Sequence, residues 1–372
     1  MTVPVRRLWM AVLCGYLAFG ATLQVLPTYV TEKFGGGALA SGTAVGIAFL
    51  ATACGRPFAG WLADAGRSRP VVITGGLLAA FGGLGQLLAP DLLLLLVARL
   101  VMGAGEAALF SAALPWVLSG ARTSQRGKLA GWFGLSMWGG LAAGPVLATL
   151  IAHAVAGGAV VWWMVVGLCV LSVLLVVSTR RDPGRMLPLG RIRLPISLPG
   201  AIIGLAAYCY GTVAALLVLR LRDAHLGGDG FALSVFAGAF LLVRFAGSPL
   251  VDRYGGRVVA VSTVAVEVVA LVAIALAGTP VVALVGTAFA GFGMALIYPA
   301  CVSMTLARGL RPGVSMGVMT SFWDLGVMAA GPLGGLIAEQ AGFPAAFVVA
   351  AGAGVVCVVV LLRMPRRAGS PR

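Results

Sequence analysis

The chain consists almost entirely of long apolar runs joined by short polar connections, from Leu8 to Leu362. An α-helix needs about 20 residues to cross the ~30 Å hydrocarbon core of a bilayer, and it pairs its backbone polar groups internally, as that core requires. The pattern therefore predicts an all-α membrane protein with twelve transmembrane helices. We expect these spans at approximately residues 8–30, 40–63, 70–89, 92–117, 128–152, 159–178, 196–219, 231–251, 257–277, 280–306, 314–338 and 343–362.

The connections between the spans differ in basic residues in a way that predicts the orientation. Cytoplasmic loops retain Arg and Lys, whereas translocated loops lose them. One side of the expected membrane carries only Lys33, Arg220 and Arg222. The other side carries twenty basic residues, namely Arg6, Arg7, Arg67, Arg69, Arg122, Arg126, Lys128, Arg180, Arg181, Arg185, Arg191, Arg193, Arg253, Arg257, Arg308, Arg311, Arg363, Arg366, Arg367 and Arg372. We therefore expect both termini in the cytoplasm and the protein in a plasma (inner) membrane. The excess of arginine over lysine indicates a bacterial source.

The composition excludes a soluble protein. Hydrophobic residues make up 60% of the chain and charged residues 10%, whereas about a quarter of the residues in soluble domains are charged. The net charge of +15 follows from the basic loops, so it indicates topology and not nucleic-acid binding. The two histidines lie at helix ends and the six cysteines are dispersed within apolar runs. Neither a catalytic constellation nor a metal site can be assembled from them, and we expect no enzyme activity and no cofactor.

The two halves of the chain repeat each other. A shift of 188 residues places Arg56 on Arg244, Asp64 on Asp252, Gly103 on Gly291 and Gly105 on Gly293, and a shift of 187 places Gly144-Pro145 on Gly331-Pro332. The most basic connection lies near the midpoint of the 372 residues. We therefore expect an N-terminal six-helix half at 1–179, a cytoplasmic basic linker at 180–195 and a C-terminal six-helix half at 196–372. Many secondary transporters are built from such repeats and bind substrate between them near the bilayer midplane.

Three motifs resemble those of the major facilitator superfamily, and the resemblance covers essentially the whole chain. The first motif follows span 2, where Gly60-Trp-Leu-Ala-Asp64-Ala-Gly66-Arg67 is similar to the family pattern but lacks one residue and the basic position after the aspartate. The second copy of this motif, after span 8, keeps a spacing closer to the family pattern than the first copy does. The resemblance implies a conformational latch made of Gly60, Asp64, Gly66, Arg67, Asp252, Arg253 and Gly255, with a weakened first copy. A plain alternative for the arginines after span 2 is a positive-inside anchor beside a tight glycine turn.

The second motif lies in span 4, where Arg99 precedes a pair of glycines and Glu106 follows them. An arginine in the membrane costs ~2.5 kcal/mol or more, and ionisable residues at this depth are usually functional. A separation of seven residues puts the two on one helix face, ~10 Å apart, so long side chains or a water could link them. We expect Arg99 and Glu106 to serve the central cavity or proton coupling. A structural pair buried within one half is the alternative.

The third motif lies in span 5, where Gly131, Gly140, Gly144 and Pro145 have a spacing that resembles the antiporter signature of drug and metabolite exporters. The resemblance implies export, with a bent and tightly packed span 5 lying against the opposite half. Ordinary packing of small residues is the alternative. Span 11 also carries a Gly-Pro pair, so that pair alone reflects duplication and not direction.

Other polar residues lie within the apolar runs. Asp324 in span 11 is a candidate proton or cation site. For Glu267 in span 9 a structural role is more plausible, and Arg56 and Arg244 are expected to pair or to extend towards the cytoplasmic surface. A further set could contact substrate, although helix packing explains each member more simply: Gln24, Trp138, Tyr208, Tyr210 and Tyr298.

Together these features predict a secondary transporter that exports a small organic molecule in exchange for protons by alternating access, with proton exchange at Glu106 or Asp324. Proton-coupled uptake of a metabolite and a sensor without net flux are the alternatives. We expect the partners to be a small-molecule substrate, protons and the lipid bilayer, with no nucleic acid, and a functional monomer. The scarcity of central charges argues against a strongly anionic substrate.

Overall fold

The computed structural model describes residues 3–120, 126–154, 159–179, 198–306 and 312–364. The expected linker at 180–195 lies outside these residues. The first half contains α1 (Val5–Phe34), α2 (Ala38–Leu62), the π-helical turn η1 (Ala63–Arg67), α3 (Ser68–Leu88), α4 (Leu92–Ser119), α5 (Arg126–Ala154) and α6 (Ala159–Val177). The second half contains α7 (Leu198–Asp223), α8 (Ala232–Tyr254), α9 (Gly256–Ala275), α10 (Pro280–Ala295), α11 (Ile297–Leu306), α12 (Pro312–Ala341) and α13 (Phe343–Arg363).

Each expected span coincides with one helix, except the tenth, which comprises α10 and α11. Ten helical segments of the described residues are apolar and long enough to cross a membrane, and one of these is the continuous stretch Ala38–Leu88. That stretch contains α2 and α3, and α8 contributes a shorter apolar helix over Ala232–Gly247. The described part of the chain therefore accommodates the twelve expected spans.

The break between α10 and α11 was not expected from the sequence, and Pro299 explains it. A proline has no backbone N–H, and its ring clashes with the carbonyl four residues earlier. The helix is interrupted at Leu296, and the carbonyl of Ala295 is left without its usual helical donor. The Arg244 guanidinium donates to this carbonyl at 3.1 Å.

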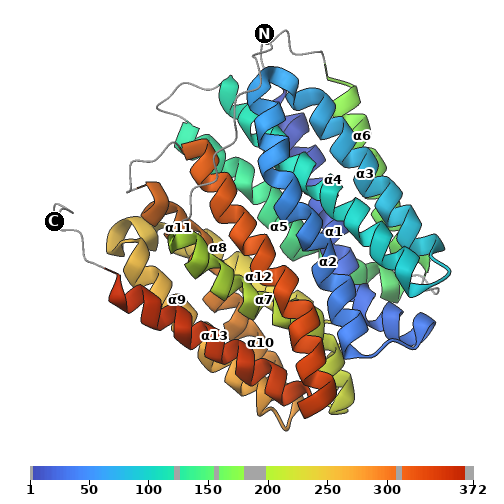
Figure 1. The fold of residues 1–372 in the computed structure, drawn as a ribbon, viewed down its shortest axis with the longest axis vertical. Helices are drawn as coiled ribbons and strands as arrows, with labels where there is room; N and C mark the ends of the chain where they lie inside the picture. Colours follow the sequence, from blue (N-terminus) through green and yellow to red (C-terminus); the bar gives the residue numbers. More distant parts are fainter. Residues whose placement is uncertain (1–2, 121–125, 155–158, 180–197, 307–311, 365–372) are drawn as a thin grey trace.

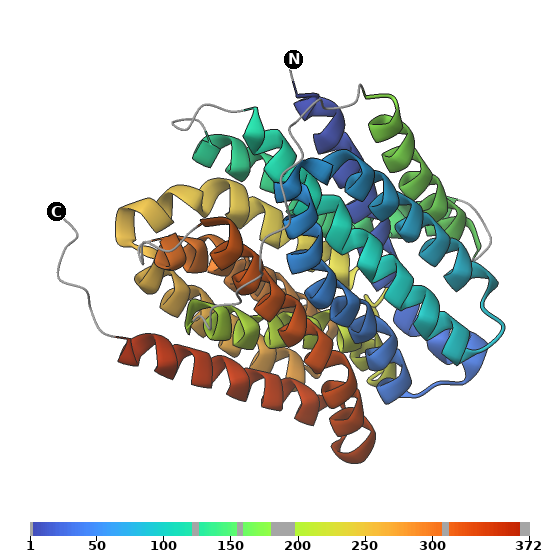
Figure 2. The same cartoon turned by 45° about the horizontal axis from the view of Figure 1, so that its top comes forward.

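The helices form two bundles that lie side by side. The blue to green helices of the first half gather at the upper right of Figure 1, and the lime to red helices of the second half gather at the lower left. The same division is visible after rotation in Figure 2. The helices α1 and α13 begin and end, respectively, on one side of the bundle (Figure 1), which we call the terminal side. The other side, where α1 ends and α2 begins, is called the opposite side.

Glycine contacts repeat between the halves with the spacing found in the sequence. A Cβ atom on Gly103 would collide with the carbonyl of Ala48, and a Cβ atom on Gly291 would collide with the carbonyl of Phe236. Both the glycines and their partners are 188 residues apart. The close approach of α4 to α2 is therefore reproduced by α10 and α8, as duplicated halves require.

The interface between the halves is formed mainly by α2 with α12 and by α5 with α8. The backbones of α2 and α12 touch near the opposite side, where a Cβ atom on Gly42 or Gly331 would collide with the carbonyl of the other. Glu339 at the end of α12 accepts a hydrogen bond of 2.8 Å from the Leu39 backbone N–H. The first turn of α2 is thus capped by a side chain from the other half.

The turns on the terminal side require glycine at two positions. Gly66 within η1 has φ 79° and Gly255 between α8 and α9 has φ 81°, a region that glycine adopts without steric cost. These are two of the expected latch glycines.

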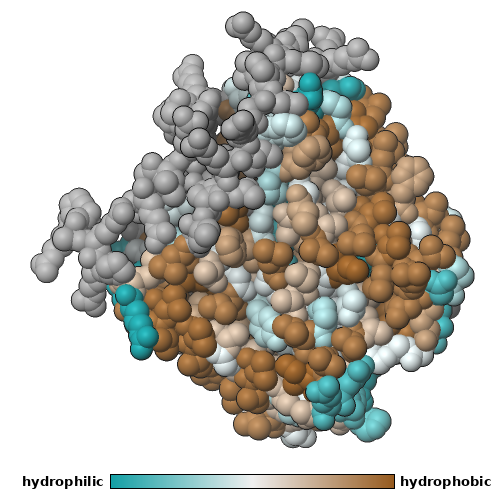
Figure 3. Space-filling model, in the orientation of Figure 1, coloured by the Kyte–Doolittle hydropathy of each residue, from teal (hydrophilic) through white to brown (hydrophobic). Residues whose placement is uncertain are grey.

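The outer surface is largely apolar, as lipid contact requires. Large hydrophobic side chains that would be unfavourable in water, such as Phe81, Leu93, Phe245 and Val269, are exposed. Brown colours dominate the described face in Figure 3, and strongly hydrophilic residues appear near its margins.

Candidate functional site

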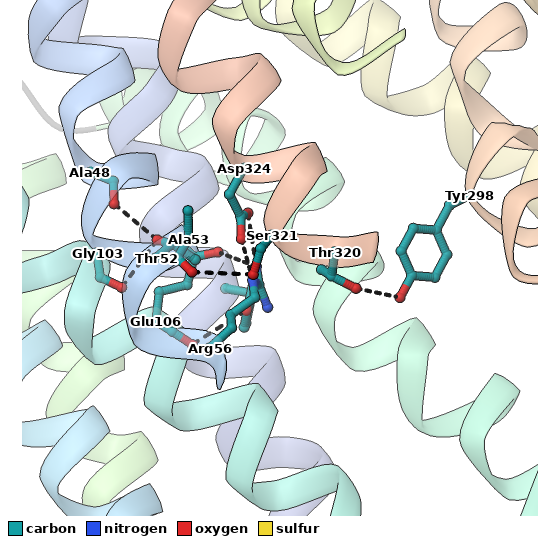
Figure 4. Close-up of polar contacts among 11 residues, drawn as sticks. Ala48, Thr52, Ala53, Arg56, Gly103, Glu106, Tyr298, Thr320, Ser321 and Asp324 are labelled. Carbon is teal, nitrogen blue, oxygen red and sulfur yellow. Dashed lines mark hydrogen bonds and ion pairs between the residues drawn. The ribbon is translucent and has the colours of Figure 1, made fainter. Parts of the chain in front are cut away.

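An ion pair joins the two halves in the middle of the bundle. Arg56 of α2 donates from Nε to Asp324 Oδ2 at 2.5 Å and from Nη2 to Asp324 Oδ1 at 3.2 Å. Glu106 of α4 adds a second carboxylate, whose Oε1 lies 3.8 Å from Arg56 Nη2. All three residues are buried: Arg56 is 6% exposed, Asp324 0% and Glu106 5%. One guanidinium from the first half thus faces one acid from each half (Figure 4).

Neighbouring polar groups surround this cluster, which we call the charged triad. Ser321 lies one turn before Asp324 and donates to the Ala53 carbonyl across the interface at 3.2 Å (Figure 4). The Tyr16 hydroxyl donates to the main-chain oxygen of Glu106 at 3.4 Å. Arg56 Nη1 and Glu106 Oε2 have no hydrogen-bond partner among the described atoms. Glu106 Oε2 can therefore accept a proton or a further hydrogen bond, and Arg56 Nη1 can donate one.

The structure places Arg99 away from the triad. Its guanidinium donates to the carbonyls of Ala44 at 2.9 Å and Val45 at 3.3 Å in α2, and it lies 5.1 Å from the centre of the Phe19 ring. The linkage to Glu106 that the sequence suggested is not made directly. Glu106 is instead paired with Arg56, which the sequence analysis had assigned to local pairing or to the membrane surface. Arg99 binds helices of the first half to one another.

An apolar chamber lies between the halves beside the triad. Its lining comes from α1 and α5 in the first half and from α7, α8, α10 and α12 in the second. The lining residues are Leu23, Trp138, Leu141, Ala142, Pro145, Tyr210, Ala214, Leu233, Phe236, Ala237, Phe240, Met294 and Trp323. Trp323 directly precedes Asp324 in α12, so this helix presents residues to both the chamber and the triad. Trp138 and Tyr210 were among the residues that the sequence analysis considered for substrate contact.

Span 5 lies against the opposite half through α8, as expected, but Gly140 and Gly144 do not make that contact and pack within the first half. A Cβ atom on Gly144 would lie 2.5 Å from the Leu17 carbonyl oxygen, and one on Gly140 would lie 2.9 Å from the Leu13 carbonyl oxygen. Both contacts are with α1. The other half is reached by larger residues of the same helix, since Trp138 packs against Phe240 at 5.8 Å between ring centres. Pro145 borders the chamber, and Gly131 lies in α5.

The expected latch residues lie around the turns of the terminal side. Asp64 is exposed within η1, and the described part of the chain contains no ion pair that involves it. Gly60 lies at the end of α2, where an added Cβ atom would meet no described atom within 4 Å. Arg253 lies 5.3 Å from the ring centre of Tyr254. The described side chains of this set thus form no ion pair with one another. Arg67 ends η1, and Asp252 lies in α8.

Polar contacts join the halves on the opposite side. Gln24 of α1 donates to the carbonyl of Gly230 at 3.1 Å, and Thr149 of α5 donates to the same carbonyl at 2.8 Å. Arg222 at the end of α7 pairs with Glu32 at 3.2 Å. With the backbone contact of α2 and α12, these bonds hold the opposite side of the interface together.

Glu267 lies apart from the interface. Its side chain is fully buried inside the second half, and neither carboxyl oxygen has a hydrogen-bond partner among the described residues. Gly293 of α10 packs against its backbone, where an added Cβ atom would lie 2.7 Å from the Glu267 nitrogen. Glu267 therefore lies outside the charged cluster at the interface, and its structural role stays a prediction.

Comparison with known proteins shows the family to which the chain belongs. The family model of the Major Facilitator Superfamily matches residues 8–217 and 196–372. The chain is 32% identical over 383 residues to an uncharacterized MFS-type transporter of Salmonella typhimurium, with 97% of each chain covered. It is also 32% identical to an uncharacterized MFS-type transporter of Burkholderia pseudomallei, with 95% of this chain and 91% of the relative covered.

Solved structures share the fold at low sequence identity. The nucleoside transporter NupG matches with a TM-score of 0.77 and 12% identity, over 97% of this chain and 100% of the other. The human organic anion transporter MFSD10 matches with a TM-score of 0.71 and 17% identity, over 96% and 99%. At such identities the likeness concerns the fold alone.

Proposed function

Because this chain belongs to the major facilitator superfamily, a family of membrane transporters, we propose that it exports a small organic molecule in exchange for protons. The observation that carries the proposal is the ion pair between Arg56 and Asp324, which crosses the interface between the halves. A pair of buried charges is stable only while both partners are charged and hydrogen-bonded. A proton at this position therefore changes the bond that holds the halves together.

The second acid provides an alternative partner for the same arginine. When Asp324 takes up a proton, its attraction to Arg56 falls, and Glu106 lies 3.8 Å from the same guanidinium. Arg56 can then turn to an acid of its own half, and α12 is released from α2. Loss of the proton restores the bond between the halves. Proton binding thus shifts the balance between two arrangements, as alternating access requires.

The proposed orientation follows from the basic loops. Cytoplasmic loops retain arginine, so the terminal side faces the cytoplasm of a bacterial plasma membrane and the opposite side faces outwards. The bonds of Gln24, Thr149 and Arg222 then close the protein towards the outside. We also propose that the protein functions as a monomer.

The direction of transport is supported by α5. Its spacing of Gly140, Gly144 and Pro145 resembles the antiporter signature, and Pro145 borders the chamber in which substrate would lie. Export in exchange for protons requires that substrate and proton favour different states of the interface. Protonation of the charged triad can favour one of these two states.

The charged triad can be tested by separating driven transport from exchange. In proteoliposomes, Asp324→Asn and Glu106→Gln should abolish the accumulation of a radiolabelled compound that the wild-type protein concentrates under a pH gradient. Exchange of labelled for unlabelled compound without a gradient should remain measurable. Glu267→Gln is the matched control, because it also removes a buried acid, and it should keep driven accumulation. Full proton-driven accumulation in the double variant Glu106→Gln/Asp324→Asn would contradict the proposal.

A further inference from the structure

The chamber beside the triad is walled by a continuous group of aromatic rings from both halves. The six rings belong to Trp138, Tyr210, Phe236, Phe240, Tyr298 and Trp323. Five of them line the chamber, and Tyr298 packs on Trp138 from behind at 5.2 Å between ring centres. Aromatic rings cost little side-chain entropy when they bind flat ligands, and they bury large areas.

The two tryptophans come from different halves and pack directly against each other. Trp138 of α5 and Trp323 of α12 meet edge to face, with ring centres 5.1 Å apart and planes at 88°. Tyr210 of α7 lies against the other side of Trp323, with ring centres 5.5 Å apart and planes at 32°. Because the two rings belong to different halves, alternating access would separate them. A flat ring inserted between them would contact both halves at once.

The chamber provides almost no polar groups. Every described residue of its lining is apolar or aromatic, and its polar atoms are the Tyr210 hydroxyl, the two indole N–H groups and main-chain groups. A hydroxyl or an ionised group buried without a partner costs several kcal/mol. Sugars, polyols and multiply charged compounds are therefore poor ligands for this space. The carboxylate of Asp324, which follows Trp323 in α12, is bonded to Arg56.

We propose that the substrate is an uncharged aromatic compound, whose ring system inserts between Trp138 and Trp323 and whose polar groups are confined to one edge. The assignment rests on the proposed function, because it takes the chamber as the transport site. An uncharged ligand also leaves the charge balance of Arg56, Asp324 and Glu106 to the proton alone. Trp138 and Trp323 then determine specificity for a flat ring.

The test measures occupancy of the chamber and does not require transport. Ala142 borders the chamber and is 8% exposed, so Ala142→Cys in a variant without native cysteines reports on this space through its rate of alkylation by N-ethylmaleimide. 2-Naphthol should slow the alkylation several-fold in purified protein. Its saturated counterpart decahydro-2-naphthol and methyl glucoside should have little effect. Equal protection by the saturated compound or by the glucoside, or no protection by 2-naphthol, would overturn the proposal.

Variants of the walls complete the test. Trp323→Leu should weaken protection by 2-naphthol about threefold to tenfold, as expected for the loss of one aromatic contact, and Trp323→Phe should restore most of it. Trp163→Leu changes a tryptophan that is 57% exposed on α6 and serves as the matched control. Unchanged protection in Trp323→Leu would refute the stacking role. Protection should persist in Glu106→Gln/Asp324→Asn, so a failure of proton coupling is distinguished from a failure of ring binding.

Discussion

At the residue scale, the proposed function depends on the arrangement of three buried charges. Arg56, Glu106 and Asp324 come from three helices and share one water-poor volume. Arg56 can pair with either acid, but the single guanidinium cannot fully bind both. A proton resolves this competition by neutralising one acid. We therefore propose that the triad couples protonation to the contact between α2 and α12.

Removal of Arg56 should destabilise the protein more than removal of the whole pair. Arg56→Met leaves two buried acids without their cation, and breaking a buried pair on one side typically costs about 3–5 kcal/mol. Arg56→Met/Asp324→Leu removes the pair and should recover most of that loss. Thermal unfolding of the purified variants in detergent would measure the difference. A double variant as unstable as Arg56→Met would show that the ion pair is not the reason for the loss.

Sequence reasoning found the acids of the triad but not its arginine partner. Glu106 and Asp324 stood out because charges are rare in apolar spans. Arg56 is 268 residues from Asp324, and only the packing of the two halves brings them together. A signal was present, since Asp324 has no cation on its own helix within the described residues and Arg56 lies in an apolar span. The deep position of Arg99 attracted attention instead, although it serves the packing of α4 on α2.

At the element scale, small residues determine how closely the helices approach each other. The expected spans match the helices because hydrophobic length decides where a chain can cross a bilayer. The turn at Gly66 was also predictable from its glycine. The helix on which α5 packs could not be predicted, because a glycine pattern indicates a close approach but not which helix makes it. Only the structure shows that α1 is the neighbour of Gly140 and Gly144.

The packing of α5 on α1 can be tested by two substitutions in one helix. Gly144→Leu would force α5 away from the α1 backbone, which a Cβ atom would approach to 2.5 Å, and overpacking of this kind costs about 1–3 kcal/mol or more. Gly139→Leu is the control, because no described atom lies within 4 Å of its added Cβ position. The thermal unfolding temperature should fall in Gly144→Leu and change little in Gly139→Leu. Equal effects would disprove the proposed contact.

The contact of α2 with α12 should control access from the opposite side. Gly331→Leu cannot coexist with the present approach to the Gly42 backbone, so it should favour a state that is open on that side. In intact cells, Ala142→Cys should then react faster with a membrane-impermeant thiol reagent added outside. Gly352→Leu, at an open position on α13, should leave the rate unchanged. A rate in Gly331→Leu no greater than in the parent would contradict the role of this contact.

At the scale of the whole molecule, duplication and charge asymmetry define the architecture. The repeat of 188 residues appears in the glycine contacts of both halves, and the basic loops define the proposed orientation. Cysteines introduced at Ser124 and Gly190 should react in intact cells only with membrane-permeant reagents. A cysteine at Gly228 should react with an impermeant reagent from outside. Labelling of Gly190→Cys by the impermeant reagent would reverse the proposed orientation.

The exchange of protons for substrate is the central claim, and flux in inside-out vesicles tests it most directly. The vesicle lumen is acidified, and a labelled compound that binds the purified protein is added outside. The compound should enter the lumen while protons leave, so that the pH gradient decays faster in wild-type vesicles than in Asp324→Asn vesicles. Uptake of the compound accompanied by protons moving into the lumen would contradict exchange and indicate a symporter.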